Sequence, residues 1–191
     1  MESKKTALIT GAGSPLGQAI AARLAQDGYA LILCGEDEAA LDRAKSALGN
    51  GAECRSYAVR QSDEAAVKEL FAKLELEHAC IDVLINAQIN NPVKSFAETQ
   101  AEDIRAAFGA SLIPAMLFTQ CAAEWMIKSG VKGGGRIVNI STDRAFQADG
   151  GSFVESVTSW ALRGTTRAMA KHLAKKAIAR PYLKRASAQA A

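Results

Sequence analysis

The sequence predicts a doubly wound α/β fold, in which helices cover both faces of a parallel β-sheet. Short runs that fit buried strands alternate along the chain with segments that have the apolar spacing of helices. Glycine-rich turns interrupt this alternation at 10–17, 49–51 and 133–135. Strands that alternate with helices pair in parallel through right-handed crossovers, so the sheet receives helices on both sides.

The first half of the chain contains four predicted strands and three predicted helices. The strands are expected at 6–9, 30–34, 53–59 and 81–85. The helices are expected at 18–26, 37–48 and 63–77, and we assign Ser62 as the N-cap of the third because serine accepts a hydrogen bond from the first helical turn.

The second half contains two long helices on either side of a fifth strand at 136–140. We expect a loop at 90–100, a helix over 101–129 with a kink at Pro114, a polar loop at 145–153 and a helix over 154–179. Pro181 should end that last helix, because the residue before a proline is disfavoured in helical conformation. Residues 1–183 then form a single domain, and 184–191 form a frayed tail.

The composition is that of an ordinary globular protein. Of 191 residues, 49% are hydrophobic and 23% are charged, which excludes disordered and fibrous classes. We expect no membrane span, because no apolar run approaches about 18 residues. The N-terminus has no signal-peptide pattern, so we expect a cytoplasmic protein.

The basic residues are concentrated near the C-terminus. Residues 1–130 carry a net charge of −5 and residues 131–191 a net charge of +8. A basic end can bind nucleic acid, but Arg163, Arg167 and Lys171 recur every four residues with no aromatic residues placed for bases to stack on. We therefore interpret this segment as a solvated helix face and do not expect nucleic-acid binding.

The four cysteines and two histidines do not form a metal-binding pattern. No Cys-x-x-Cys motif is present, and His78 and His172 are isolated from each other. The sequence predicts no metal site, reduced cysteines in the core and histidines at the surface.

The glycine-rich turn at 10–17 reads Thr-Gly-Ala-Gly-Ser-Pro-Leu-Gly and connects the first strand to the first helix. Such a turn places backbone N–H groups and the positive end of a helix where a pyrophosphate could bind. The alternative is a strand-to-helix turn that binds nothing.

Three segments together resemble the short-chain dehydrogenase/reductase family over residues 4–180. They are the glycine-rich turn, the fourth strand with its Asp82-Val83-Leu84-Ile85-Asn86, and the fifth strand with its Gly135-Arg136-Ile137-Val138-Asn139-Ile140-Ser141-Thr142. The resemblance implies a Rossmann-like sheet in the order 3-2-1-4-5. It also implies an oxidoreductase that uses NAD or NADP, with an Asn, Ser, Tyr and Lys set for proton transfer.

The resemblance fails at most of the catalytic positions. Thr142 stands in place of the family serine and keeps a hydroxyl, and Ser111 stands in place of the asparagine. Where the family has Tyr-x-x-x-Lys, this chain has Glu155 and Ser159. Neither a phenol activated by a neighbouring ammonium nor a charged contact to the nicotinamide ribose is available there.

The resemblance also assigns a cofactor-binding set, with departures. The assigned residues are Gly11, Gly13, Ser14, Leu16, Gly17, Glu36 and Asn86. Pro15 removes an N–H donor from the turn, Gln88 and Ile89 bring side chains to a place that usually admits adenosine, and Arg60 falls where an aspartate commonly holds adenine. Glu36 would repel a 2′-phosphate, so NAD is favoured over NADP if either binds.

Two functional hypotheses follow. The first is a pseudoenzyme retained for binding or assembly, which forms a homodimer through helices 101–129 and 154–179. The candidate contacts are Met116, Phe118, Trp125, Trp160, Leu162 and Met169, and the alternative is that these side chains face the protein's own sheet. The second is an atypical NAD-dependent oxidoreductase that uses Thr142 as carbonyl donor and Glu155 as acid/base. The resemblance further leads us to expect no substrate lid and no further strands, which leaves the fifth strand as an edge in need of protection.

Overall fold

The structure is a computed structural model that describes residues 4–78, 80–89, 93–131, 134–148, 150–174 and, for the backbone, 179–185. A parallel sheet has the strand order β3-β2-β1-β4-β5-β6. This confirms the predicted order 3-2-1-4-5 and adds a sixth strand beside β5. The strands are β1 (Thr6–Thr10), β2 (Ala30–Gly35), β3 (Cys54–Ala58), β4 (Val83–Asn86), β5 (Arg136–Ser141) and β6 (Ala179–Arg185).

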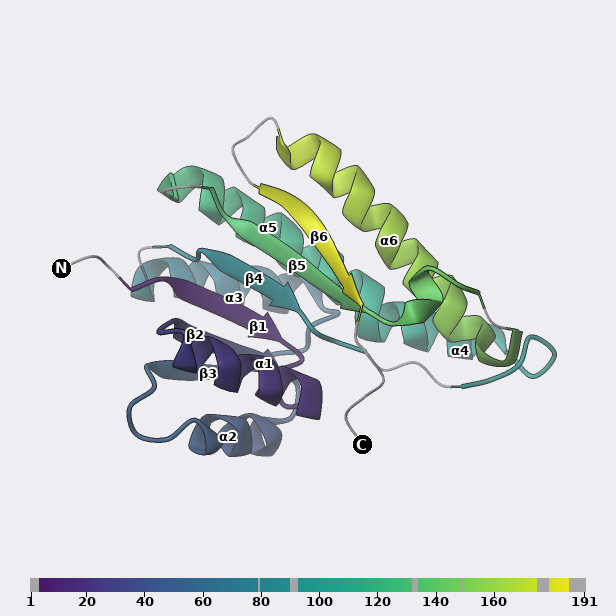
Figure 1. The fold of residues 1–191 in the computed structure, drawn as a ribbon, viewed down its shortest axis with the longest axis horizontal. Coiled ribbons are helices and arrows are strands. Elements are labelled where there is room, and N and C mark those ends of the chain that lie inside the picture. The colour runs from purple at the N-terminus through teal and green to yellow at the C-terminus, as the bar shows by residue number, and fades with distance from the viewer. Residues whose placement is uncertain are drawn as a thin grey trace.

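Helices cover both faces of this sheet (Figure 1). They are α1 (Pro15–Gln26), α2 (Glu38–Ala47), α3 (Glu64–Glu77), α4 (Ala101–Ala107), α5 (Ile113–Ser129) and α6 (Phe153–Leu173). Successive side chains of a strand point to opposite faces, so Leu8 of β1 packs in a cluster with α3 and α5, whereas Ala7 and Ile9 pack in a cluster with α1 and α2. One hydrophobic cluster therefore lies between each face of the sheet and the helices that cover it, so the fold has three layers.

The helix starts are set by side-chain caps. Ser14 accepts a hydrogen bond from the Gly17 N–H, so α1 begins at Pro15 rather than at the predicted residue 18. Asp63, and not the predicted Ser62, caps α3 by accepting from the Ala65 and Ala66 N–H groups.

The predicted helix over 101–129 is interrupted by a π-helical turn, η1 (Phe108–Leu112), between α4 and α5. The Ile113 N–H donates to the Phe108 carbonyl, five residues back. Pro114 has no N–H to give to the preceding turn, which explains why the regular ladder is broken at the predicted position. The stretch 101–129 is also long and apolar enough to pass a length-and-composition test for a membrane span. Half of its most apolar window is buried inside the fold.

The prediction of a helix up to residue 179 is wrong. Helix α6 ends at Leu173, and β6 pairs in parallel with β5 from Ala179 to Arg185. The pairing register gains one residue on β6 between Ala179 and Tyr182, and Pro181 lies in this irregularity. A proline is tolerated at a bulge or an edge strand because no ladder hydrogen bond is required from it there. Residues 184 and 185, predicted as tail, belong to this strand, and 186–191 lie outside the described residues.

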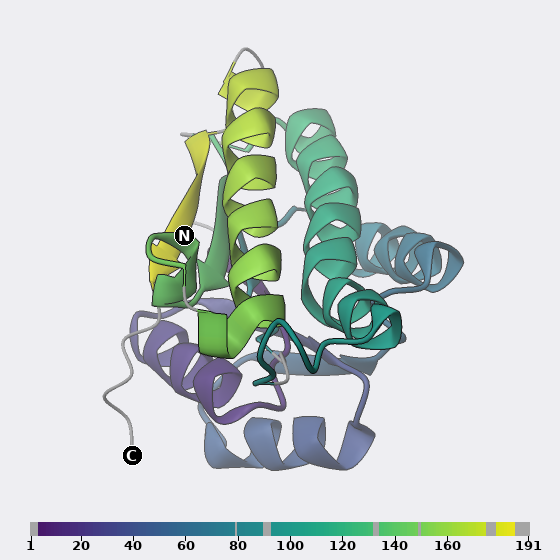
Figure 2. The same cartoon turned by 90° about the vertical axis from the view of Figure 1, so that its right-hand side faces the viewer.

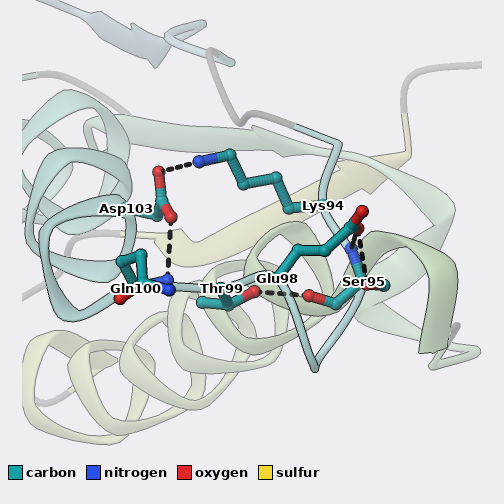
Figure 3. A network of polar contacts seen from close by, with 6 residues as sticks. All are labelled: Lys94, Ser95, Glu98, Thr99, Gln100 and Asp103. Atoms are coloured by element: carbon teal, nitrogen blue, oxygen red, sulfur yellow. Dashed lines mark hydrogen bonds and ion pairs between the residues drawn. The ribbon is translucent and has the colours of Figure 1, made fainter.

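The loop before α4 is held by polar contacts (Figure 3). Lys94 and Asp103 form an ion pair of 2.7 Å, and Asp103 also accepts from the Gln100 N–H. The hydrogen bond from Lys94 lowers the pKa of Asp103. Glu98 accepts from both the N–H and the hydroxyl of Ser95, and these bonds lower the pKa of Glu98. The predicted loop is thus an ordered connection over its described part, 93–100.

The cysteines and histidines agree with the predictions only in part. All four cysteines are free, but Cys34 alone is fully buried, and the other three are half-buried. His172 is exposed as predicted, whereas His78 is half-buried and burial lowers its pKa.

Candidate functional site

The glycine-rich turn brings β1 and the start of α1 into close contact. Gly11 has φ = 63°, a left-handed conformation that favours glycine. A Cβ atom on Gly17 would lie 2.3 Å from the Gly11 carbonyl oxygen, so only glycine lets α1 approach the turn this closely. Pro15 carries no N–H and the Gly17 N–H is used by Ser14 Oγ, so this helix start presents fewer free donors than a regular one.

A cavity of about 390 Å³ opens beside this turn, at the carboxyl ends of the central strands. Its wall brings together four of the seven predicted cofactor-binding residues: Gly11, Gly13, Ser14 and Glu36. The other lining residues come from the ends of β2 and β4, from α2, from the residues after β3 and from the π-turn region, namely Gly35, Asp37, Ala40, Gln61, Ala87, Gln88, Ile89, Ala110 and Pro114.

The three remaining predicted residues do not line the cavity. Gly17 packs against the backbone of the turn, and Leu16 packs against the cluster that contains Ile85 and Ile140. Asn86 is buried in a polar chain. Arg60 is exposed and lies on a different surface hollow, while its neighbour Gln61 faces the cavity.

The polar chain crosses the interior from β1 to α6. The Thr10 hydroxyl oxygen lies 3.2 Å from Asn86 Oδ1, and Asn86 Nδ2 donates to Asn139 Oδ1 at 2.8 Å. Asn139 Nδ2 donates to Thr166 Oγ1 at 2.9 Å, and the Thr166 hydroxyl donates to the Leu162 carbonyl. All of these side chains except Leu162 are polar and at least nine-tenths buried, so the chain satisfies groups that would otherwise be costly to bury. The family motifs pointed to the two asparagines, whereas Thr166 carried no signal in the sequence.

The catalytic-equivalent positions meet at a second, much smaller cavity. Ser111, Thr142 and Ser159 line a space of about 10 Å³, together with Gln88, Ile89 and residues of β5 and α6. The hydroxyls of Thr142 and Ser159 lie 3.2 Å apart and form a hydrogen bond. Ser111 donates to the Ala107 carbonyl across the π-turn. The predicted set is therefore brought together, except for Glu155.

Glu155 points to another partner. Its carboxylate lies 4.0 Å from Arg144 Nε, and among the described residues it lines neither cavity. The acid/base role predicted for Glu155 needs a position that this pairing does not provide.

Two amide side chains in the larger cavity have a polar atom without a partner among the described residues. Gln61 is 3% exposed and its Oε1 accepts no hydrogen bond, while Gln88 Nε2 is buried and donates none. Gln88 Oε1 accepts from the Thr10 hydroxyl at 2.8 Å. Gln61 was missed in the sequence. The available signal was a polar side chain three residues after the end of β3, at the edge of the sheet where the neighbouring strands also end.

These residues fit one part of a dinucleotide and not the other. The larger cavity offers a helix start for phosphate and a carboxylate from Glu36 for ribose hydroxyls. The space next to Thr142 and Ser159 is about the size of one water molecule and does not fit a nicotinamide ring.

Known proteins have sequences similar to this one. The model of the short chain dehydrogenase family matches residues 5–180. An uncharacterized oxidoreductase of Thermotoga maritima is 29% identical over 172 residues, which are 90% of this chain and 66% of that protein. A (2S)-[(R)-hydroxy(phenyl)methyl]succinyl-CoA dehydrogenase subunit of Thauera aromatica is 31% identical over 91% of this chain and 68% of its own length. The chain thus spans about two thirds of the length of these relatives.

Solved structures have the same fold as this chain. A 3-ketoacyl-(acyl-carrier-protein) reductase from Brucella melitensis complexed with NADH superposes with a TM-score of 0.85 at 25% identity, over 94% of this chain and 74% of that one. An NAD+-bound xylitol dehydrogenase superposes with a TM-score of 0.87 at 24% identity, over 95% and 70%, and shows the same fold. With a family model that matches nearly the whole chain, this protein belongs to the short-chain dehydrogenase family of oxidoreductases.

Proposed function

We propose that this chain is a nucleotide-binding member of its family that does not act as a standard dehydrogenase and is retained for binding or assembly. One observation carries the proposal: the catalytic-equivalent positions hold two hydroxyls that bond each other, Thr142 and Ser159, in a space of about 10 Å³. A carbonyl substrate and a nicotinamide ring do not fit there together.

The chemistry of the side chains supports this proposal. Proton transfer to a carbonyl requires a group whose pKa lies near the working pH and whose proton reaches the substrate. The serine and threonine hydroxyls do not ionise near neutral pH, and the sequence offers no Tyr-x-x-x-Lys. Glu155 is directed toward Arg144 instead.

For the ligand we propose an adenine nucleotide of the NAD type. The solved structure of the Brucella melitensis reductase, which has NADH bound, supports a nicotinamide cofactor as the ligand. Glu36 lies on the cavity wall at the end of β2, where a carboxylate accepts from ribose hydroxyls and repels a 2′-phosphate. We therefore expect NADH to bind more tightly than NADPH.

Calorimetric titration with NADH and NADPH tests the binding, and an NADH-oxidation assay over a panel of ketones and aldehydes tests the activity. We expect saturable NADH binding without turnover. Glu36→Gln should bring the two affinities closer, with the remote Glu102→Gln as the matched control. Robust turnover, or no binding at millimolar cofactor, would each count against the proposal.

A second candidate is the atypical oxidoreductase that uses Thr142 and Glu155. It is favoured by one observation, that Glu155 lies one helical turn before Ser159 and that its side chain is only 16% exposed. It predicts turnover that Glu155→Gln abolishes and Arg144→Gln raises. Turnover unaffected by Glu155→Gln would exclude this role.

We also propose a homodimer through α5 and α6, which lie side by side on one face (Figure 2). Of the candidate contacts from the sequence, Phe118, Trp125 and Leu162 are buried in the protein's own core and are unavailable. Met169 is partly buried and packs against that core. Met116 and Trp160 are exposed, as are Ile113 and Ile127 of the same face. Large exposed apolar side chains on neighbouring helices favour self-association.

Light scattering at about 100 μM, some tenfold or more above a micromolar Kd, tests this assembly. We expect a dimer that Met116→Lys with Trp160→Lys converts to a monomer, while Leu76→Lys, an exposed substitution on α3, has no effect. A monomeric wild-type protein would refute the dimer.

A further inference from the structure

A groove lies between the C-terminal halves of α5 and α6, where these two helices lie next to each other (Figure 2). Its volume is about 460 Å³. Its walls include Gln120, Ala123 and Ile127 of α5 and Ala168 of α6. Because the two alanines have small side chains, the helices leave a hollow between them at this level.

The N-terminal half of α5 carries a side chain that matches this hollow. Met116 is 36% exposed, and it lies four residues before Gln120, seven before Ala123 and eleven before Ile127. Helical residues at these spacings lie along one stripe, so Met116 belongs to the stripe that lines the groove. An unbranched, flexible methionine is suited to fill an irregular gap. One copy of the chain therefore carries both a protruding apolar side chain and a hollow, at opposite ends of the same stripe.

The exposed positions of α5 are arranged symmetrically about Gln120. Ile113 and Ile127 are each 41% exposed and lie seven residues before and after it. Met116 and Glu124, which are also exposed, lie four residues before and after it. In a dimer with a two-fold axis, a residue at the axis contacts its own copy, and the residues on either side of it exchange places. A second α5 laid antiparallel on the first, with the axis at Gln120, thus brings Met116 of each copy to the groove of the other.

Gln120 can fix this alignment of the two helices. Its side chain is exposed and forms no hydrogen bond within the ranges of the chain that the structure describes. An amide carries both a donor and an acceptor, so two glutamines related by a two-fold axis can donate to each other. Any other alignment would bury this amide against apolar side chains without a partner, and a polar residue at a helix seam specifies register for that reason.

Building on the homodimer proposed above, we propose that α5 docks antiparallel on the α5 of a second copy, with the two-fold axis at Gln120. Met116 of each copy fills the groove of the other, Ile113 packs on Ile127, and the two Gln120 amides bond each other. The occupant of the groove is a second copy of this chain. The contact is closed, because each copy supplies one protruding side chain and one groove.

Opposite charges at Gln120 test the position of the axis. In Gln120→Glu and in Gln120→Lys, like charges face each other across the axis, so the dimer Kd of each variant alone should rise at least about tenfold. A one-to-one mixture of the two variants should dimerise at least about tenfold more tightly than either alone, because opposite charges then meet. Light scattering over a concentration series of the full chain measures these constants. Gln26→Glu and Gln26→Lys, at an exposed glutamine of α1, are the matched controls and should leave the dimer unchanged.

A second pair of variants tests the groove. Ala168→Phe places a large side chain in the groove from an exposed position, and Met116→Ala removes the side chain that fills it. Each variant alone should dimerise at least about tenfold more weakly than the wild type, through overpacking in the first and a lost contact in the second. Their mixture should associate more tightly than either alone, because one intact Met116 then meets one open groove and the new phenylalanine takes the space of the missing methionine.

The outcomes separate this arrangement from the dimer on which it rests. A dimeric wild type whose Gln120 variants dimerise as tightly as the Gln26 controls overturns the axis at Gln120 and leaves the dimer intact. Charged variants that stay monomeric when mixed also overturn that axis. An Ala168→Phe protein that dimerises like the wild type overturns the role of the groove. A monomeric wild type overturns both the arrangement and the dimer. The substitutions at Gln120 and Ala168 are at exposed positions, so the fold does not depend on them.

Discussion

Replacing Gly17 with alanine should destabilise the fold, although alanine is the better helix former. The new Cβ atom would lie 2.3 Å from the Gly11 carbonyl oxygen and 2.7 Å from the Ala12 Cα atom. Both neighbours are backbone atoms of the glycine-rich turn, so relief requires α1 to move away from the turn by about 1 Å to restore ordinary contact distances. Overpacking of this kind costs about 3 kcal/mol, and the helix propensity of alanine offsets up to about 1 kcal/mol, which leaves a net loss of about 2 kcal/mol.

Gly164 provides the matched control. It lies in α6, it is exposed, and nothing lies within 4 Å of the position of an added Cβ atom. Gly164→Ala should therefore stabilise the protein by up to about 1 kcal/mol. In urea titrations, with an m value of about 2 kcal/mol/M, the midpoint should fall by about 1 M for Gly17→Ala and rise by up to about 0.5 M for Gly164→Ala. A Gly17→Ala protein as stable as the wild type would refute the close approach of α1 to the turn.

Three further predictions follow from the buried polar chain, an ionisable cluster and a thiol. Asn139→Ala should lower the free energy of unfolding by about 3 kcal/mol and Thr166→Val by about 1 kcal/mol. The double variant should lose less than the sum of the two, because the two side chains share a hydrogen bond. Strictly additive losses would contradict this. The hydrogen bond from Tyr57 lowers the pKa of Glu77, so its contribution to stability is present above the ordinary pKa of about 4.3 and is lost as the pH falls through the lowered folded value. In Glu77→Gln, the midpoint of urea unfolding should depend less on pH in that acidic range than in the wild type. An unchanged pH dependence would count against the contact between Tyr57 and Glu77. Burial raises the pKa of the Cys34 thiol far above its usual range, so iodoacetamide at pH 8 should modify it, by peptide mass mapping, only in the urea-unfolded protein; labelling in the native state would disprove its burial.

The sequence was sufficient for five of the six strands of the described sheet. Strands β1, β2 and β4 are short apolar runs, and the strand order follows from the family resemblance that the family model supports. β6 was missed because Pro181 reads as a helix stop. Its tolerance in a strand depends on the irregular register against β5, which is a tertiary property.

The candidate site was predictable in part of its membership and not in its geometry. The motifs identified Thr142 and Ser159 as neighbours, and their hydroxyls are indeed in contact. Nothing in the pattern showed that Glu155 would turn toward Arg144, because side-chain pairing across a loop depends on how that loop packs. The unpartnered acceptor of Gln61 could not be predicted either, since satisfaction of a buried group is decided by every element around it.

The residues of the family motifs fall into two sets according to where they lie in the fold. Gly17, Asn86 and Asn139, which match the family, are held by contacts within the scaffold itself. Gln88 and Ser159, which depart from it, face the two cavities, where a side chain has fewer neighbours to satisfy. A substitution on a cavity wall therefore disturbs fewer contacts than one in the scaffold beneath it, so the fold can persist while the residues at the cavities vary.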